Sequence, residues 1–363
     1  MYSVTNGLQV GDIILLRGGA KHSAVIAAAT GGHFSHVCLV VDHSQVVEAV
    51  SSGGVQFTSC LRVVVQSLSN IAVLRPTFLD EESLREAQSR ILDLAMGHQS
   101  RGYSLLGATQ ALKKGGKQVE QGKFFCSQLV ANIYRSIGYP LFDRPDHKVT
   151  PNDYIRSEKF NNVTSQAVSK IPEYFLSRIS SYGNTLVPLD GDGTSASDTA
   201  IVFEEFLKKA RRTFRAHHLP IPERLIDVIE IITRPESKSL RAKVDSKLVK
   251  AFDEVDVVGR LRQAKGPADV DDSEKVIEEI SQFGQGFVDH ELKACDALTK
   301  HTRNQLAKNS EYHSFFRHIS KEFRLEYAAR MADYHSFVAE CCEEVLRNNQ
   351  KIRQIFSGFS KEE

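Results

Sequence analysis

The chain has 363 residues, which is long for a single hydrophobic core, so we expect two domains. Its 46 basic and 45 acidic residues nearly cancel, and the net charge of +1 argues against nucleic acid as a partner. No stretch approaches the roughly 18 apolar residues of a transmembrane helix. No basic residue precedes the first apolar run, as it would in a signal peptide. We therefore expect a cytoplasmic protein in the producing cell, with export as an effector without a cleaved signal as the alternative.

Six cysteines occur at positions 38, 60, 126, 295, 341 and 342. None is spaced as Cys-x-x-Cys, and the spacings show no disulfide framework. A reducing compartment is the simplest interpretation of this pattern.

The first part of the chain reads as short strands separated by glycines and turn residues. Apolar or alternating runs predict strands at 10–17, 34–42, 46–50, 55–58, 63–65 and 71–75. The alanine-rich segment 22–30 predicts a short helix after the first strand. In the strand 34–42, His36, Cys38 and Val40 share one face, so a thiol is expected beside the histidine.

Two helices follow these strands. Residues 80–96 carry apolar side chains at helical spacing, with acidic residues in the first turn. A second helix begins near Cys126, where Leu129, Val130, Ile133 and Tyr134 form an apolar stripe that Gly138 ends. Residues 1–162 are therefore predicted to form an α+β domain with a small, mostly antiparallel sheet.

The rest of the chain has a different composition. Residues 163–198 are predicted to connect the domains, with a helix at 171–181 and a linker at 189–198 that is rich in Gly, Asp, Ser and Thr. Residues 199–363 are predicted to be helical, ending in one helix over 311–355 whose aromatic and aliphatic residues recur every four positions. Such helices pack as a bundle or a coiled-coil arm. They are where a protein or membrane-surface partner is expected to bind.

Cys126 opens the helix that is buried on one side. The first-turn amides of a helix have no intrahelical acceptor and carry partial positive charge, which stabilises a thiolate. A free cysteine in such a place is also an ordinary small core residue, so the helix alone does not decide. Cysteine catalysis needs a base and a group that orients the base. His36, at a strand start, and Glu48, an acid within an apolar strand, are the candidates.

A zinc site is a competing interpretation of the same region. Histidines, a cysteine and an aspartate gather within it: His22, His33, His36, His43, Cys38 and Asp42. However, His33 and His36 flank a strand start and point to opposite faces. No second pair of residues follows at ligand spacing. We therefore expect no metal and no other cofactor.

The order of these residues resembles a known family. Phe34-Ser35-His36-Val37 resembles the histidine motif of NlpC-type, papain-like cysteine peptidases, and Val47-Glu48-Ala49 resembles the strand of their third catalytic residue. Phe125-Cys126-Ser127-Gln128 resembles their cysteine motif. The order His, acid, Cys is similar to that of the circularly permuted branch, which includes YiiX-like proteins and the lecithin:retinol acyltransferase group. Gly11-Asp12-Ile13 resembles the opening motif of this branch. The resemblance covers about residues 8–155.

The resemblance implies a permuted papain-like fold in which Cys126 attacks a carbonyl carbon, His36 transfers the proton and Glu48 orients the imidazole. It also implies support for the oxyanion and its surroundings from Tyr103, Ser127 and Gln128. A tight hairpin between the two strands would place Glu48 opposite Leu39 or Val40. A bulge, a twist or a wider loop is then needed to bring Glu48 to His36.

The branch is associated with amide, peptide and lipid-acyl substrates. The first expectation is therefore a thiol hydrolase acting on a peptide or an acyl lipid through an acyl-enzyme. The second is an acyltransferase that uses the same residues on lipid or protein lysine, including as a host-directed effector. The third is a non-catalytic interaction protein in which the papain-like domain is only a scaffold.

Overall fold

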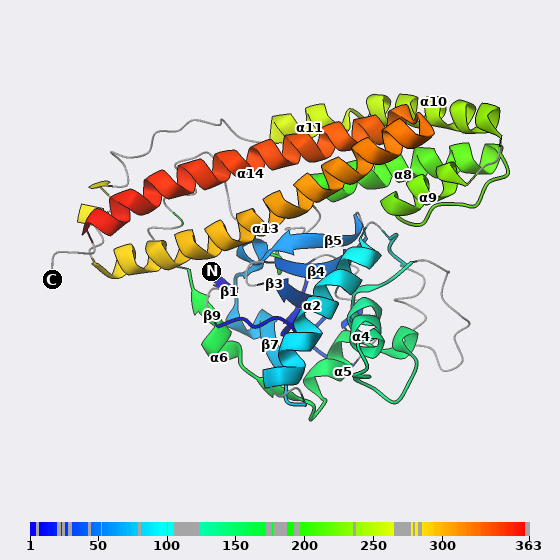
Figure 1. Cartoon of the computed structure of the whole chain (residues 1–363). Coiled ribbons are helices and arrows are strands. Elements are labelled where there is room, and N and C mark those ends of the chain that lie inside the picture. The colour runs from blue at the N-terminus through cyan, green and yellow to red at the C-terminus, as the bar shows by residue number, and fades with distance from the viewer. Residues whose placement is uncertain are drawn as a thin grey trace. The chain divides into compact units, whose positions relative to one another are not determined.

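The computed structural model describes residues 1–4, 7–19, 23, 26–27, 31–42, 45–51, 53–78, 81–99, 101–104, 123–171, 176, 187–191, 197–234, 237–264, 277–278, 280–281 and 285–359. The chain forms two compact units, Met1–Glu204 and Glu205–Glu363 (Figure 1). The first unit is α+β and the second is helical. Among the described helices, none has the length and apolarity that crossing a bilayer requires.

A six-stranded antiparallel sheet forms the centre of the first unit. In spatial order its strands are β5 (Gly54–Ser59), β4 (Gln45–Val50), β3 (His36–Asp42), β2 (Ile13–Leu16), β7 (Ile71–Pro76) and β8 (Phe160–Asn162). Each neighbouring pair is antiparallel. The predicted α+β class and antiparallel sheet are confirmed.

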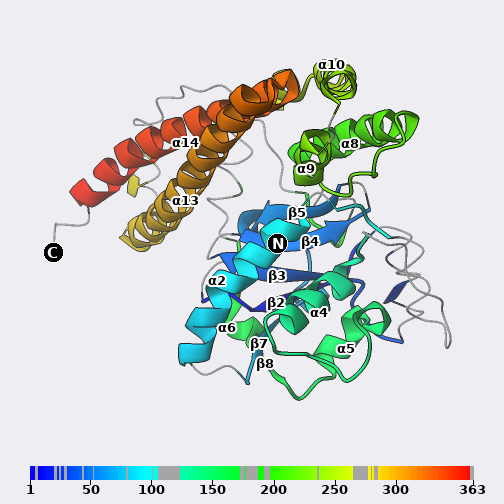
Figure 2. The same cartoon turned by 45° about the vertical axis from the view of Figure 1, so that its right-hand side comes forward.

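Two helices cover one face of this sheet (Figure 2). They are α2 (Glu81–His98) and α4 (Cys126–Ser136), and they confirm the predictions at 80–96 and near Cys126. The apolar core beneath them includes Leu15, Val37, Leu39, Ile91, Leu129 and Ile133. Between α4 and β8 the chain forms η3 (Asp146–Lys148) and α5 (Pro151–Ile155).

The other face of the sheet packs against a three-stranded sheet of order β6-β1-β9. These strands are Val64–Val65, Tyr2–Val4 and Val168–Lys170, and the short helices η1 (Cys60–Arg62) and η2 (Leu68–Asn70) lie near β6 in the chain. The apolar residues between the sheets include Ile14, Cys38, Val40, Val65 and Val168. Because successive residues of a strand point to opposite faces, β3 contributes to both cores.

The first unit extends past the predicted domain end at residue 162. Residues predicted to connect the domains form α6 (Thr164–Ala167) and β9, and β9 pairs with β1 at the start of the chain. A three-residue strand is too short to show an alternating pattern, so periodicity could not predict it. Most residues of the predicted helices at 22–30 and 171–181, part of the linker at 189–198, and His22 and His43 lie outside the described residues.

The second unit contains the helices α9 (Leu225–Thr233), α10 (Lys238–Val255), α11 (Val257–Ala264), α13 (Gln285–Phe323) and α14 (Glu326–Phe359), together with most of α8 (Asp198–Ala216). The two long helices α13 and α14 run side by side as an antiparallel pair (Figure 1). A helical arm was predicted here.

The prediction of one continuous helix over 311–355 was wrong. The chain turns between α13 and α14 at Arg324, whose φ of 56° lies in the left-handed region. The next residue, Leu325, is buried. The apolar spacing continues unchanged on both sides of this corner, so the sequence pattern did not reveal the break.

Candidate active site

His36 and Glu48 lie on neighbouring strands in a register that differs from the predicted one. Cys38 is opposite Glu48, and the pairing of β3 with β4 shifts between Val40 and Asp42. The prediction that Glu48 faces Leu39 or Val40 was wrong because this bulge inserts an extra residue into β3. Since side chains alternate along a strand, His36, Cys38 and Glu48 share one face of the sheet.

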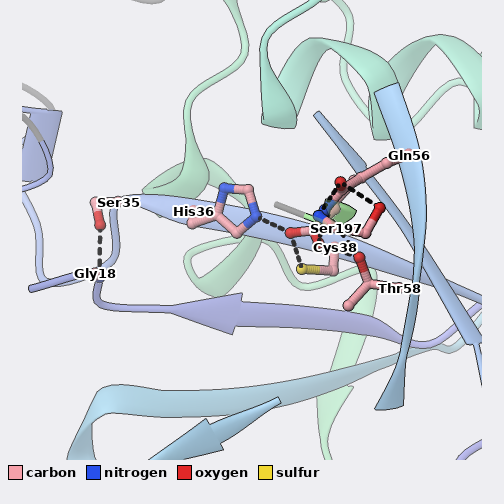
Figure 3. A network of polar contacts seen from close by, with 8 residues as sticks. Gly18, Ser35, His36, Cys38, Gln56, Thr58 and Ser197 are labelled. Carbon is pink, nitrogen blue, oxygen red and sulfur yellow. Dashed lines mark hydrogen bonds and ion pairs between the residues drawn. The ribbon is translucent and has the colours of Figure 1, made fainter. Parts of the chain in front are cut away.

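Both carboxylate oxygens of Glu48 make polar contacts with neighbouring side chains. His36 Nε2 lies 2.7 Å from Glu48 Oε2, and Glu48 Oε1 accepts hydrogen bonds from Gln56 Nε2 at 2.9 Å and Thr58 Oγ1 at 2.6 Å (Figure 3). The thiol of Cys38 donates to Glu48 Oε2 at 3.6 Å. Glu48 itself is only 1% exposed. The carboxylate therefore has a fixed orientation toward the imidazole.

These contacts set the protonation of Glu48 and His36. Burial alone would raise the pKa of Glu48, but the hydrogen bond and charge of His36, with Thr58 and Gln56, outweigh it and lower that pKa to about 2. Burial alone would lower the pKa of His36. Interactions with Cys38, Cys126 and Glu48 outweigh this and raise it well above its usual value. The pair therefore favours a carboxylate facing an imidazolium.

Cys126 is the first residue of α4 and is 4% exposed. The preceding residue, Phe125, is extended, and no side chain caps the helix. The first turn is anchored from below, since Ser127 Oγ donates to the Val149 carbonyl at 2.8 Å and the Tyr154 hydroxyl donates to the Ser127 carbonyl at 2.7 Å. The Cys126 thiol is among the groups whose interaction raises the pKa of His36. The structure thus brings Cys126, His36 and Glu48 together.

Tyr103 belongs to the same neighbourhood. It forms a β-bridge with Phe124, closed by hydrogen bonds from Ser104 N to Phe124 O and from Phe124 N to Gly102 O, each 3.0 Å. Burial raises the pKa of Tyr103, Cys126 adds to this, and His36 opposes it. The phenol therefore stays protonated and lies close enough to interact electrostatically with Cys126 and His36.

The other two predicted supporting residues have different surroundings. The Ser127 hydroxyl donates its proton to the Val149 carbonyl, so it supports the start of α4. Gln128 Oε1 is buried and has no hydrogen-bond partner among the residues that the structure describes.

Gln56 and Thr58 were missed by the sequence analysis. Both lie on β5, are 2% and 4% exposed, and alternate with the apolar Val55 and Phe57. Polar residues that alternate with apolar ones normally indicate a solvated face. A buried acid on the next strand reverses that interpretation, but only the strand pairing reveals it. Ser197 N donates in turn to Gln56 Oε1 at 3.0 Å (Figure 3).

The strand that carries His36 is fixed at its start and alongside. Asn152, 1% exposed, accepts from Phe34 N at 3.0 Å and donates to Phe34 O at 2.8 Å, as a neighbouring strand would. In the opening motif, the buried Asp12 accepts two hydrogen bonds from Arg75, at 2.9 and 2.7 Å. Asp12 therefore anchors the sheet and takes no part in the cluster around His36.

Residues 7–175 match the family of permuted papain-like amidase enzymes of the YaeF/YiiX type, family C92. The first unit is therefore similar to permuted papain-like domains. A solved structure, that of the metalloprotein YiiX from Escherichia coli O157:H7, is similar with 19% identity over 43% of this chain and 96% of that chain, at a TM-score of 0.31. No curated protein matches the chain.

The matched family is one of amidase enzymes, and the similarity covers most of the first unit. The match ends at residue 175, so the helical unit, which begins at Glu205, lies outside it.

Proposed function

We propose that the protein is a cysteine-dependent amide hydrolase with Cys126 as nucleophile, His36 as general base and acid, and Glu48 as the residue that orients His36. One observation carries the proposal. The imidazole of His36 interacts both with a buried carboxylate, 2.7 Å from its Nε2, and with the thiol at the start of α4. This is the relation of nucleophile, base and orienting group that thiol catalysis requires.

The first half of the reaction forms an acyl-enzyme. The Cys126 sulfur attacks the amide carbon as the thiolate, with its proton on His36. Glu48 stabilises the imidazolium and holds Nδ1 toward the sulfur, because Nε2 is committed to the carboxylate. The negative oxygen of the tetrahedral intermediate is stabilised by the Cys126 amide N–H and the Tyr103 hydroxyl. His36 then gives its proton to the departing amine as the C–N bond breaks.

The second half returns the enzyme to its starting state. His36, now neutral, takes a proton from water, and the hydroxide attacks the thioester carbon. The carboxylic acid product leaves as the C–S bond breaks, and Cys126 and His36 share the proton again. An amine or alcohol in place of water would give acyl transfer through the same intermediate. The amidase description of the matched family favours water as the acceptor.

The test is selective labelling of thiols in metal-free protein by an electrophilic probe. We expect Cys126 to react faster than the buried Cys38 and Cys60, and His36→Ala to slow that reaction by about 10²- to 10⁴-fold. Cys60→Ser is the matched control, because it removes a buried thiol without touching His36. Equally slow labelling of all three cysteines would contradict the proposal.

A substrate screen then distinguishes hydrolysis from transfer. Acyl esters, fatty-acylated lysine and peptidoglycan peptides cover the amide, peptide and acyl classes, with Cys126→Ala as the inactive control. We expect release of the free acid at a rate that added amine does not redirect. A product carrying the added amine would instead indicate an acyltransferase.

A further inference from the structure

The mechanism leaves one buried thiol beside the acid without a role. Cys38 is 1% exposed, and its sulfur lies 3.6 Å from Glu48 Oε2. One donor atom each from His36, Cys38 and Glu48 lies within 4.8 Å of the other two. A ring nitrogen, a thiol sulfur and a carboxylate oxygen are the donors that Zn²⁺ takes in proteins. We propose that these three side chains bind one Zn²⁺ ion and that the ion switches the Cys126 centre off.

The spacing of the donor atoms agrees with this site. Tetrahedral zinc with bonds of about 2.0 to 2.3 Å separates its ligand atoms by about 3.3 to 3.7 Å. The distance from Cys38 Sγ to Glu48 Oε2, 3.6 Å, already lies in this range. The distance from His36 Nε2 to Glu48 Oε2, 2.7 Å, is that of a hydrogen bond. Entry of the metal therefore requires these two groups to separate by about 0.6 Å and to give up the proton between them.

The outer contacts also suit a metal ligand. Metal-binding carboxylates are usually held by further hydrogen bonds to the oxygen that does not face the metal. In Glu48, Oε1 receives Gln56 and Thr58, while Oε2 faces His36 and Cys38. Three protein ligands leave the fourth position of a tetrahedral ion for water.

Zinc at this site blocks the proposed base by simple proton accounting. Binding replaces the proton on His36 Nε2 and the proton on the Cys38 thiol with the metal, so proton release accompanies metal binding. An imidazole bound to metal through Nε2 keeps its remaining proton on Nδ1. It cannot then accept a proton from Cys126 or from water. The same ion also takes the Glu48 oxygen that orients the ring.

The binding experiment uses Co²⁺ as a coloured probe on the full chain. The background variant carries Cys341→Ser and Cys342→Ser, which removes the two partly exposed thiols of the helical unit. We expect one Co²⁺ per chain, displaced by Zn²⁺, with a sulfur-to-metal charge-transfer band. Cys38→Ser should abolish the band, whereas Cys126→Ala and the matched control Cys60→Ser should retain it. A band that survives Cys38→Ser, or that Cys126→Ala abolishes, would overturn the site.

Thr58→Val guards against a Cys38 variant that does not fold. It keeps all three ligands and removes one hydrogen bond to Glu48, so we expect Zn²⁺ affinity to fall by about 10- to 100-fold. Calorimetry in buffers of different ionisation enthalpy measures both the affinity and the proton release. If the Zn²⁺ affinity of Thr58→Val is unchanged in protein whose substitution has been verified, binding through Glu48 is contradicted.

The inhibitory step rests on the proposed function and has its own readout. One equivalent of Zn²⁺ should slow probe labelling of Cys126 by at least about tenfold, and a chelator should restore it. In Cys38→Ala, the ratio of rates with and without Zn²⁺ should approach one. Slow labelling of Cys126 without metal, together with an intact Co²⁺ band, would contradict the proposed hydrolase and support the metal site. Fast labelling of Cys126 that Zn²⁺ leaves unchanged or accelerates would contradict the proposed inhibition.

Discussion

Each unit of the molecule buries a carboxylate, and the two have different partners. Glu48 in the first unit is 1% exposed and faces side chains, among them the titratable His36. Asp245 on α10 of the helical unit is 7% exposed and faces backbone. It accepts the N–H groups of Glu326 and Tyr327, at 2.8 and 2.9 Å, where α14 begins. Glu48 therefore contacts a side chain that can carry a proton, whereas Asp245 contacts the start of a helix.

The difference appears in their pKa values. Burial raises the pKa of both acids, but in Glu48 the contact with His36 and two side-chain donors reverses the sign and lowers the pKa to about 2. In Asp245 the amides of Tyr327 and Glu326 do not fully offset burial, and the pKa stays raised. Backbone amides cannot change charge, so Asp245 fastens the corner after Arg324. A carboxylate facing a histidine instead controls which protonation state is present.

The largest expected effect separates catalysis from stability. Glu48→Gln keeps the shape of the side chain but loses its charge, so kcat/KM should fall by about 10⁴-fold, as for other orienting acids. Asp245→Ala should leave kcat/KM unchanged and lower the unfolding free energy by about 1 to 3 kcal/mol, because two buried N–H groups lose their acceptor. Steady-state kinetics and denaturant titrations measure the two quantities. An Asp245→Ala protein that stays folded but loses activity would break the comparison.

The two acids should also give opposite pH dependence of stability. The folded pKa of Glu48, about 2, lies below its unfolded value of about 4.3, so its stabilisation is present above that value and is lost as the pH falls through 2. The folded pKa of Asp245 lies above its unfolded value. Its contribution is therefore full at low pH and is lost as the pH rises through the folded pKa.

Unfolding free energies between pH 5 and pH 2 test these signs, because His36 is protonated in both folded and unfolded chains there. The difference between the native protein and Glu48→Gln should shrink toward pH 2, by on the order of 3 kcal/mol. The difference between the native protein and Asp245→Asn should move the other way. Parallel trends for both variants would show that the two carboxylates are used alike.

The next effect concerns the donors that hold Glu48. Thr58→Val keeps the branched shape of the side chain but removes the 2.6 Å hydrogen bond to Oε1 and the acceptor for Gln56 Nε2. Hydrogen bonds to charged groups contribute about 1.5 to 3 kcal/mol, so kcat/KM should fall by about tenfold or more. The pKa of Glu48 should also rise, which moves the acid limb of the stability profile upward. A drop in activity with an unmoved acid limb would indicate a packing defect and no positioning role for Thr58.

Local periodicity was sufficient to predict the strands around His36 and Glu48, the helix at Cys126 and the helical second half. These features depend on residues close in sequence. The bulge that sets Cys38 opposite Glu48, the corner at Arg324 and the strand β9 depend on pairing and packing between distant segments. Gln56 shows the limit most clearly. Its alternating pattern indicates solvent until the neighbouring strand is known to carry a buried acid.

Ser197 carries the smallest predicted effect, and it combines both kinds of contact in one residue. Its hydroxyl accepts from Ala200 N at 3.2 Å near the start of α8, as a helix cap does. Its backbone N–H donates to Gln56 Oε1 at 3.0 Å, which turns the amide nitrogen of Gln56 toward Glu48. The hydroxyl also donates to Gln56 Oε1, at a longer 3.4 Å, so the backbone makes the closer contact with Gln56 and the side chain alone caps the helix.

Ser197→Ala should cost about 1 kcal/mol of stability, as lost caps do, and leave kcat/KM within about twofold, because the N–H that holds Gln56 is kept. Ser197→Pro removes that N–H. It should lower kcat/KM several-fold and raise the pKa of Glu48, because Gln56 then loses the closest of the contacts that orient its amide toward the carboxylate. Kinetics and the acid limb of the stability profile, measured on both variants, distinguish the two contacts. Equal activity in the Ala and Pro variants would show that Gln56 keeps its orientation without Ser197. The residues of β5 would then be sufficient to position Glu48.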